Sequence, residues 1–211
     1  MKKTTSSLLV AAALAGSAFA AQAQDNAFKI GVTRYDTHAK TNGISGIGVP
    51  PGADVKVSDE NTIILVYERR IGTNFGAEIV MGIPPTIKAT AAGSVAFLGT
   101  VLETELWAPT LLFNYHFFEP GTTWRPYVGI GINYTKFKDV KSSFGDVELG
   151  SSWGPAAQVG INYAITKDID AFASLAAVKV KSKVVASGST VLTTKVDFRP
   201  TVYSVGVAYK F

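Results

Sequence analysis

The chain has 211 residues, a formal net charge of +4, 47% hydrophobic residues and no cysteine. The lack of cysteine excludes a disulfide framework and thiolate chemistry, and no cluster of basic residues suggests nucleic acid as a partner. Beyond the first segment, no run reaches the roughly 18 consecutive apolar residues of a membrane helix. Apolar residues that are frequent but arranged in short alternating runs indicate a chain made mainly of β-strands.

The first segment has the order of a secretory signal peptide. Two lysines precede a short apolar stretch (Leu8–Ala15), and small residues follow with two cleavage sites, after Ala20 and after Ala23. We expect residues 1–23 to be removed, with cleavage after Ala20 as the open alternative, and residues 24–211 to form the barrel domain. Loss of the two lysines lowers the formal charge from +4 to +2.

Eight strands follow in chain order. Each can supply the roughly 9–11 residues that a tilted strand needs to cross a bilayer. The connections after the second, fourth and sixth strands are short, whereas those after the first, third, fifth and seventh are long. This alternation predicts an all-β fold, an eight-stranded antiparallel transmembrane β-barrel with short periplasmic turns and long extracellular loops. The predicted strands are residues 28–36, 62–70, 74–84, 106–118, 125–137, 152–165, 168–181 and 200–211.

The two faces of the predicted strands favour a membrane barrel over a soluble one. In the strand 125–137, Val128 and Ile130 share one face, and the other face carries small or neutral residues such as Gly129 and Asn133. A water-facing outer wall would carry charges in the middle of its strands, but here the charges lie near the ends. We therefore expect the apolar face to contact lipid and the small residues to point into a narrow lumen. A soluble lipocalin-like barrel is the structural alternative.

Aromatic residues gather at both ends of the predicted strands. Such belts anchor membrane barrels at the two lipid–water interfaces. On the loop side, the predicted belt contains Trp107, Phe137 and Trp153. At the other end, the last strand closes with Tyr209 and Phe211, which we expect the barrel-assembly machinery to recognise.

Several segments resemble one family of small outer-membrane proteins. Arg125–Thr135, Ser152–Tyr163 and the closing Tyr209–Phe211 are similar to segments of the OmpW family, and Ala108–Leu111 is similar to its Pro-Pro-Thr-Leu segment, with alanine in place of the first proline. The resemblance covers the whole chain after the signal peptide. It implies an eight-stranded barrel with a narrow, largely apolar interior that admits small hydrophobic molecules and releases them sideways into the membrane.

The face assignments give an independent view of the lumen. Towards the long loops, the inward positions are apolar, where a water-filled pore would be polar. They form either a packed core or an apolar chamber that binds solutes from outside, and both interpretations stay open. The predicted apolar lining is Ile64, Val66, Val80, Leu112, Phe172, Ala176 and Val178.

Charges of both signs converge on the other end of the lumen. Buried ions must be paired and hydrogen-bonded, so we expect a network that plugs the periplasmic end. Such a plug argues against a general diffusion pore, although its members could equally serve stability alone. The predicted plug is Lys29, Glu68, Glu78, His116, Arg125 and Lys210, with Asp170 as a further candidate.

Pro109 lies within the predicted strand 106–118 and has no amide hydrogen for the ladder. One hypothesis is a lateral gap between this strand and the strand 74–84, through which a solute could pass into lipid. The alternative is that the proline only ends a strand near the loops.

Together these features predict a protein of the bacterial outer membrane that acts as a narrow channel for passive uptake of small hydrophobic molecules. Its expected partners are outer-membrane lipid and small hydrophobic solutes. The alternative is a structural or surface-interaction barrel with a closed interior, whose loops bind phage or host. No catalytic set can be assembled, so we expect no enzyme, and the two histidines lack the spacing of a metal site, so we expect no cofactor.

Overall fold

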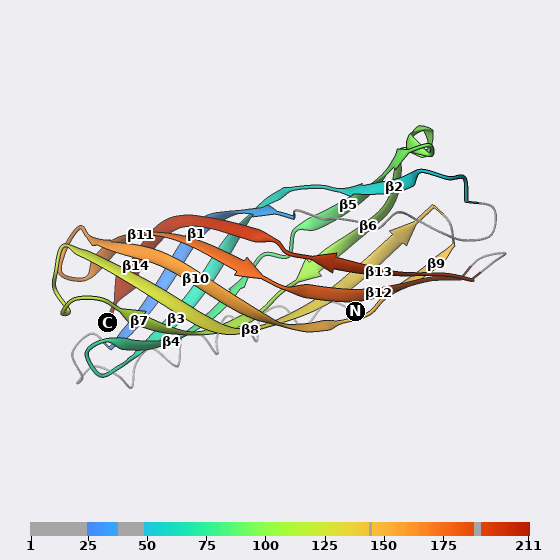
Figure 1. Ribbon diagram of the computed structural model, residues 1–211. Helices are drawn as coiled ribbons and strands as arrows, with labels where there is room; N and C mark the ends of the chain where they lie inside the picture. The colour runs from blue at the N-terminus through green and yellow to red at the C-terminus, as the bar shows by residue number, and fades with distance from the viewer. Residues whose placement is uncertain (1–24, 38–48, 144, 188–190) are drawn as a thin grey trace, which may run out of the picture.

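A computed structural model of the chain describes residues 25–37, 49–143, 145–187 and 191–211, so the predicted signal peptide lies outside the described residues. Eight strands pair in a closed antiparallel cycle, because the first pairs with the last as well as with its sequence neighbour. Figure 1 shows the resulting elongated barrel from the side. In the order of the cycle the strands are β1 (Asn26–Asp36), β3 (Glu60–Ile71), β4 (Phe75–Gly82), β7 (Thr110–His116), β8 (Trp124–Ser142), β10 (Ser152–Ala164), β11 (Ile169–Val178) and β14 (Thr201–Lys210).

The predicted fold class is confirmed. The three short connections join β3 to β4, β7 to β8 and β10 to β11 at one end, where the C-terminus also lies (Figure 1). Gly72, in the turn between β3 and β4, has a φ of 70°, a conformation that side chains other than glycine adopt only with strain. In the part of the chain that the structure describes, no helix is long and apolar enough to cross a membrane.

The long connections are more regular than the sequence suggested. The predicted ends agree with most barrel strands within a few residues, for example at Asp36 of β1 and Ser152 of β10, but strand structure continues beyond them. Most of these segments continue as paired strands that project beyond the barrel wall as extended hairpins (Figure 1). The sequence analysis predicted long loops here, but threonine and valine also favour strands once a partner strand is available. The additional elements are β2 (Ala53–Val57), β5 (Thr86–Gly93), a 3-10 turn η1 (Ala96–Leu98), β6 (Thr100–Trp107), β9 (Asp146–Leu149), β12 (Val180–Ser187) and β13 (Val191–Phe198).

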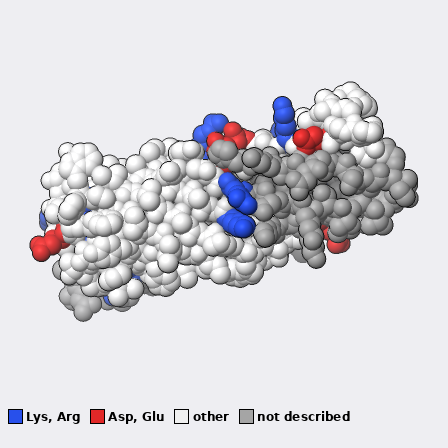
Figure 2. Space-filling view, in the orientation of Figure 1, with Lys and Arg blue, Asp and Glu red and all other residues white. Residues whose placement is uncertain are grey.

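The outer face of the wall is apolar. Ile130 is 73% exposed and its neighbours Val128 and Ile132 are also exposed, as the alternation predicted. Figure 2 shows a broad part of the barrel with almost no charged side chains, bounded by charges at the turn end and near the start of the hairpins. An apolar outer face of this kind suits contact with lipid tails.

Aromatic rings line both edges of this apolar face. Near the turns, Trp124 lies 4.5 Å from Tyr163 between ring centroids, and near the hairpins Tyr134 lies 4.7 Å from Trp153. The placement of Phe137 in the outer belt was wrong. Its side chain lies on the wall of the internal cavity, because it shares the inward alternation of the preceding odd-numbered residues of β8.

Glycines inside the barrel make room for large inward side chains. The Phe172 ring covers Gly31 and Gly206, and a Cβ atom on either glycine would lie 2.9 or 2.8 Å from the ring. In the same way, the Tyr127 ring packs directly on Gly160. The small residues therefore do not leave the lumen empty; they allow two aromatic rings to cross it.

Candidate functional site

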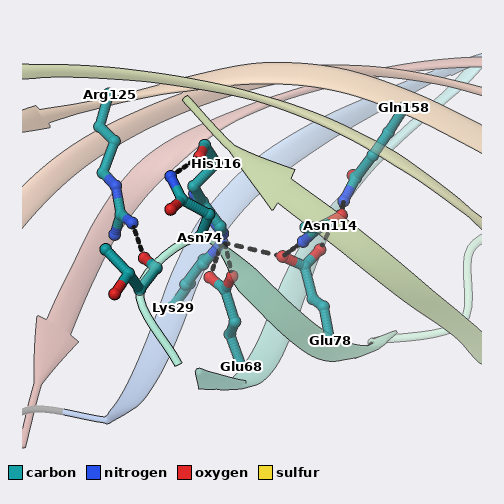
Figure 3. A network of polar contacts seen from close by, with 9 residues as sticks. Lys29, Glu68, Asn74, Glu78, Asn114, His116, Arg125 and Gln158 are labelled. Carbon is teal, nitrogen blue, oxygen red and sulfur yellow. Dashed lines mark hydrogen bonds and ion pairs between the residues drawn. The ribbon is translucent and has the colours of Figure 1, made fainter. Parts of the chain in front are cut away.

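A buried ionic cluster crosses the lumen near the turns (Figure 3). The Lys29 Nζ atom lies 2.9 Å from a carboxylate oxygen of Glu68 and 2.9 Å from one of Glu78, and all three side chains are at most 4% exposed. His116 bonds through Nε2 to the second oxygen of Glu68. These residues come from β1, β3, β4 and β7, so the cluster ties together four adjacent strands. We call these four residues the ionic cluster.

Neutral amides complete the ionic cluster. Asn114 donates to Glu78 at 3.0 Å, and Gln158 donates both to Glu78 at 3.2 Å and to the Asn114 side-chain oxygen at 2.7 Å. Gln158 comes from β10, across the barrel, so these bonds span the lumen (Figure 3). Sequence reasoning missed both amides as site residues, because alternation marks them as inward but only the structure shows their contact with the carboxylates.

The other predicted plug residues lie apart from the ionic cluster. Lys210 pairs with Asp170 at 2.6 Å, and both side chains are 8% exposed. Arg125 reaches from β8 to donate to the backbone carbonyl of Thr73, in the turn between β3 and β4. The predicted plug residues therefore fall into three groups of direct contacts: the ionic cluster, the pair of Lys210 with Asp170, and the bond of Arg125 to Thr73. All six residues are nevertheless buried at the turn end of the lumen.

Above the ionic cluster lies a cavity of about 90 Å³. Lys29, Glu78 and Gln158 form part of its lining, so the polar groups serve as its floor. The rest of the wall is mostly apolar, and all seven residues of the predicted lining lie on it. Four of these, Ile64, Val66, Leu112 and Phe172, are at most 5% exposed.

The wall beside this cavity has one interrupted seam. Pairing between β4 and β7 ends at Val80 and Thr110, and pairing between their extensions β5 and β6 begins again at Thr86 and Glu105. In between, the described residues show a single backbone hydrogen bond across the seam, from the Leu106 amide to the Pro85 carbonyl at 2.9 Å. We call this interruption the ladder break; it lies between residues 81–85 and residues 106–109.

Pro109 lies in the ladder break, at the position that the sequence indicated. Its carbonyl accepts a hydrogen bond from the Tyr134 amide of β8 at 2.9 Å. In an antiparallel ladder the amide and carbonyl of one residue point to the same neighbour. The amide that proline lacks would therefore face β8, and the missing bonds to β4 need another cause.

The last predicted site is the C-terminal strand. Tyr209 is exposed on the outer face of β14, and its ring stacks on that of Phe211 at 6.0 Å; their recognition by the barrel-assembly machinery stays a prediction. Among the described residues, no group of three or more His, Asp and Glu could hold a metal ion.

Comparison with known proteins identifies relatives over most of the chain. A model of the OmpW family matches residues 22–211. Outer membrane protein W of Vibrio cholerae is 30% identical over 141 residues, which cover 66% of this chain and 63% of that protein. The dibenzothiophene metabolism operon protein PahQ of Pseudomonas aeruginosa is 35% identical over 112 residues, which cover 52% of this chain and 51% of that protein. The chain thus spans between half and two-thirds of the length of these relatives.

Among solved structures, the crystal structure of the outer membrane protein OprG from Pseudomonas aeruginosa has a TM-score of 0.80 and 26% identity. The match covers 90% of this chain and 97% of that chain. OprG and the V. cholerae protein are outer-membrane proteins by name.

Proposed function

The chain belongs to the OmpW family, and its barrel crosses the bacterial outer membrane; on that premise we propose that it is a narrow channel for passive uptake of small hydrophobic molecules. A solute enters the apolar cavity from the side of the hairpins and leaves sideways into the membrane at the ladder break. Export through the signal peptide 1–23 and insertion through the C-terminal strand with Tyr209 and Phe211 are part of this proposal.

One observation carries the proposal: an apolar cavity has a closed polar floor and an interrupted wall. The ionic cluster and its amides close the way towards the periplasm. Beside the ladder break, the cavity is lined from both flanks, by Val80 and Ile87 on one side and by Ala108 and Thr110 on the other. Moving an apolar solute past buried charges is costly, whereas the exit at the ladder break leads directly to lipid.

The name of one relative agrees with the proposed class of solute. PahQ is named after an operon for the metabolism of dibenzothiophene, a flat apolar aromatic compound. A cavity lined by aliphatic side chains and the Phe172 ring offers such a compound dispersion contacts without a need for hydrogen bonds.

Uptake by cells tests the proposal. We would express the full chain in a strain that lacks its own relatives and measure the initial rate of dibenzothiophene uptake. Val80→Asp and Leu112→Asp each place a charge in the cavity, and we expect uptake to fall to the level of cells without the protein. Leu112→Met is the matched control, because it keeps an apolar side chain of similar volume and should retain uptake.

The amount of folded barrel in the outer membrane is measured in each strain, so that loss of protein is not read as loss of transport. Normal uptake by both aspartate variants would contradict a route through the cavity.

One observation favours the second candidate function, surface interaction. The hairpin of β5 and β6 ends in η1, where Phe97 is 82% exposed and Leu98 is 42% exposed. Buried Ala53, Ala91 and Val95 form a small core beneath it. If the protein acts by surface binding, Phe97→Ser should weaken adhesion of phage or host cells and leave dibenzothiophene uptake unchanged.

A further inference from the structure

Apart from the bond between Leu106 and Pro85, the two flanks of the ladder break form their hydrogen bonds away from each other. On the β4 side, the Ile83 amide donates to the Ile63 carbonyl of β3 at 2.9 Å, and the Thr62 hydroxyl donates to the Ile83 carbonyl at 2.6 Å. Gly82 lies so close to β3 that a Cβ atom there would lie 2.5 Å from the Ile63 oxygen. The end of β4 is therefore drawn towards β3.

On the other flank, the register shows which bond is missing. Extending the pairing of Val80 with Thr110 by two residues would place Gly82 opposite Ala108. Because backbone groups alternate in direction along a strand, and those of Pro109 face β8, the groups of Ala108 face β4. In a continuous ladder the Ala108 carbonyl would accept from the Gly82 amide.

The Asn133 side chain donates to the Ala108 carbonyl instead. Its Nδ2 atom donates to the Ala108 carbonyl at 3.2 Å and to the Thr110 hydroxyl at 2.8 Å, with a longer contact of 3.4 Å to the Pro109 carbonyl. The Thr135 hydroxyl donates to Asn133 Oδ1 at 2.6 Å, which fixes the orientation of the amide. Asn133 is 2% exposed and Thr135 1% exposed, so both side chains act without competition from bulk water.

We infer that Asn133 is the positioning residue of the lateral exit: its amide replaces the Gly82 amide as partner of the Ala108 carbonyl and so keeps β7 apart from β4. The physical need is clear, since a backbone carbonyl inside a membrane must find a donor. The Thr110 hydroxyl supplies one donor to the Ala108 carbonyl at 3.2 Å, and with Asn133 present the second comes from β8, so the ladder stays interrupted. Without Asn133 the second acceptor position of this carbonyl is open to the Gly82 amide, and the two flanks pair.

This inference rests on the proposed function for its transport readout, but its structural part can be tested separately. Asn133→Leu removes the donors and keeps a similar volume. Thr135→Val keeps Asn133 and removes only the bond that orients it. Thr33→Val is the matched control, because Thr33 is also an inward threonine and is 2% exposed. Its hydroxyl bonds to the Tyr203 carbonyl and to Ser204 on the neighbouring strand β14, on the side of the barrel away from the ladder break.

Amide hydrogen exchange, measured by NMR on the full barrel in lipid bilayers, is the structural readout. In Asn133→Leu we expect the Gly82 amide to exchange roughly two- to tenfold more slowly, as one new backbone hydrogen bond implies. Dibenzothiophene uptake by cells should fall by a similar factor. Thr135→Val should give smaller changes of the same sign, and Thr33→Val neither change.

The outcomes separate the two proposals. Unchanged Gly82 exchange in both Asn133→Leu and Thr135→Val would overturn the role of Asn133, whatever happens to uptake. Slower exchange without a change in uptake would show that Asn133 holds the ladder break but that solutes do not leave there, which would overturn the assignment of the exit. If the unaltered protein transports no dibenzothiophene, the proposed function fails, and the exchange measurement still decides whether Asn133 keeps the flanks apart. If Asn133→Leu does not fold, Thr135→Val provides the decision alone.

Discussion

The half of the lumen near the turns and the half near the hairpins are built by the same inward alternation, but their contents differ. Near the turns, inward positions carry Lys29, Glu68 and Glu78, whose charges are matched within 2.9 Å. Near the hairpins, inward positions carry Val80 and Val178, which line a cavity. A barrel of eight strands is barely wide enough for side chains, so the choice of side chain decides whether each half is closed or hollow.

The backbone pairing of the barrel wall also differs between the two halves. The seam between β8 and β10 pairs without interruption from Trp124 with Tyr163 to Thr135 with Ser152, whereas the seam between β4 and β7 stops beside the cavity. Closure near the turns and a ladder break further up mean that the weak point of the barrel faces lipid instead of the periplasm. The comparison teaches that the supply of polar partners decides which part of the barrel is closed and which part is left open, and predictions about each half follow.

The largest effect is expected in the closed half, from Lys29→Met. The change leaves Glu68 and Glu78 as buried carboxylates without their cation, which should destabilise the barrel by about 3–5 kcal/mol. Urea unfolding of the barrel in lipid vesicles, followed by its altered gel mobility, measures this loss.

Lys167→Met is the control for Lys29→Met. Lys167 lies 3.8 Å from Asp168, but its side chain is 86% exposed, and the loss should be at most about 0.5 kcal/mol. Equal losses in both variants would show that the ionic cluster does not lock this half.

The prediction of strands and faces from the sequence succeeded where alternation is the only requirement. Val128 and Ile130 point outward and the predicted cavity lining points inward because the period of two is fixed by strand geometry. The same reasoning failed for segments such as Thr86–Gly93, which became strands because neighbouring hairpins offered partners. Pairing beyond the membrane depends on such partners, and composition does not reveal them.

In the candidate site, the charged residues could be predicted from the sequence, whereas the neutral amides could not. Lys29 and Glu78 could be assigned to a plug because a buried ion needs a counter-ion. Gln158 and Asn133 carry no charge, and their importance depends on which groups lie within about 3 Å across the barrel. That distance is set by the tilt and stagger of the closed sheet, which a single sequence does not specify.

A medium effect is expected where the two halves meet, from Gly160→Val. The Tyr127 ring packs on Gly160, and its face lies 5.2 Å from Lys29 Nζ, so an added side chain must displace the ring from the ionic cluster. Overpacking of this kind should cost about 1–3 kcal/mol in the same unfolding assay. Ala157→Val, on the exposed face of the same strand, is the control and should change little. An unaffected Gly160→Val barrel would mean that the Tyr127 ring can leave without loss.

The smallest effect is expected from Pro109→Ala in the interrupted seam. The new amide would face β8, as the bond from the Tyr134 amide to the Pro109 carbonyl indicates, so it adds no bond to β4 and the ladder break remains. Dibenzothiophene uptake should therefore decrease only slightly, and clearly less than in Asn133→Leu. An increase in uptake would contradict a lateral exit at this seam, since removing a strand-breaking residue cannot widen the break. A loss as large as that of Asn133→Leu would instead assign the break to the fixed φ of proline, because Asn133 and its bond to Ala108 are still present in that variant.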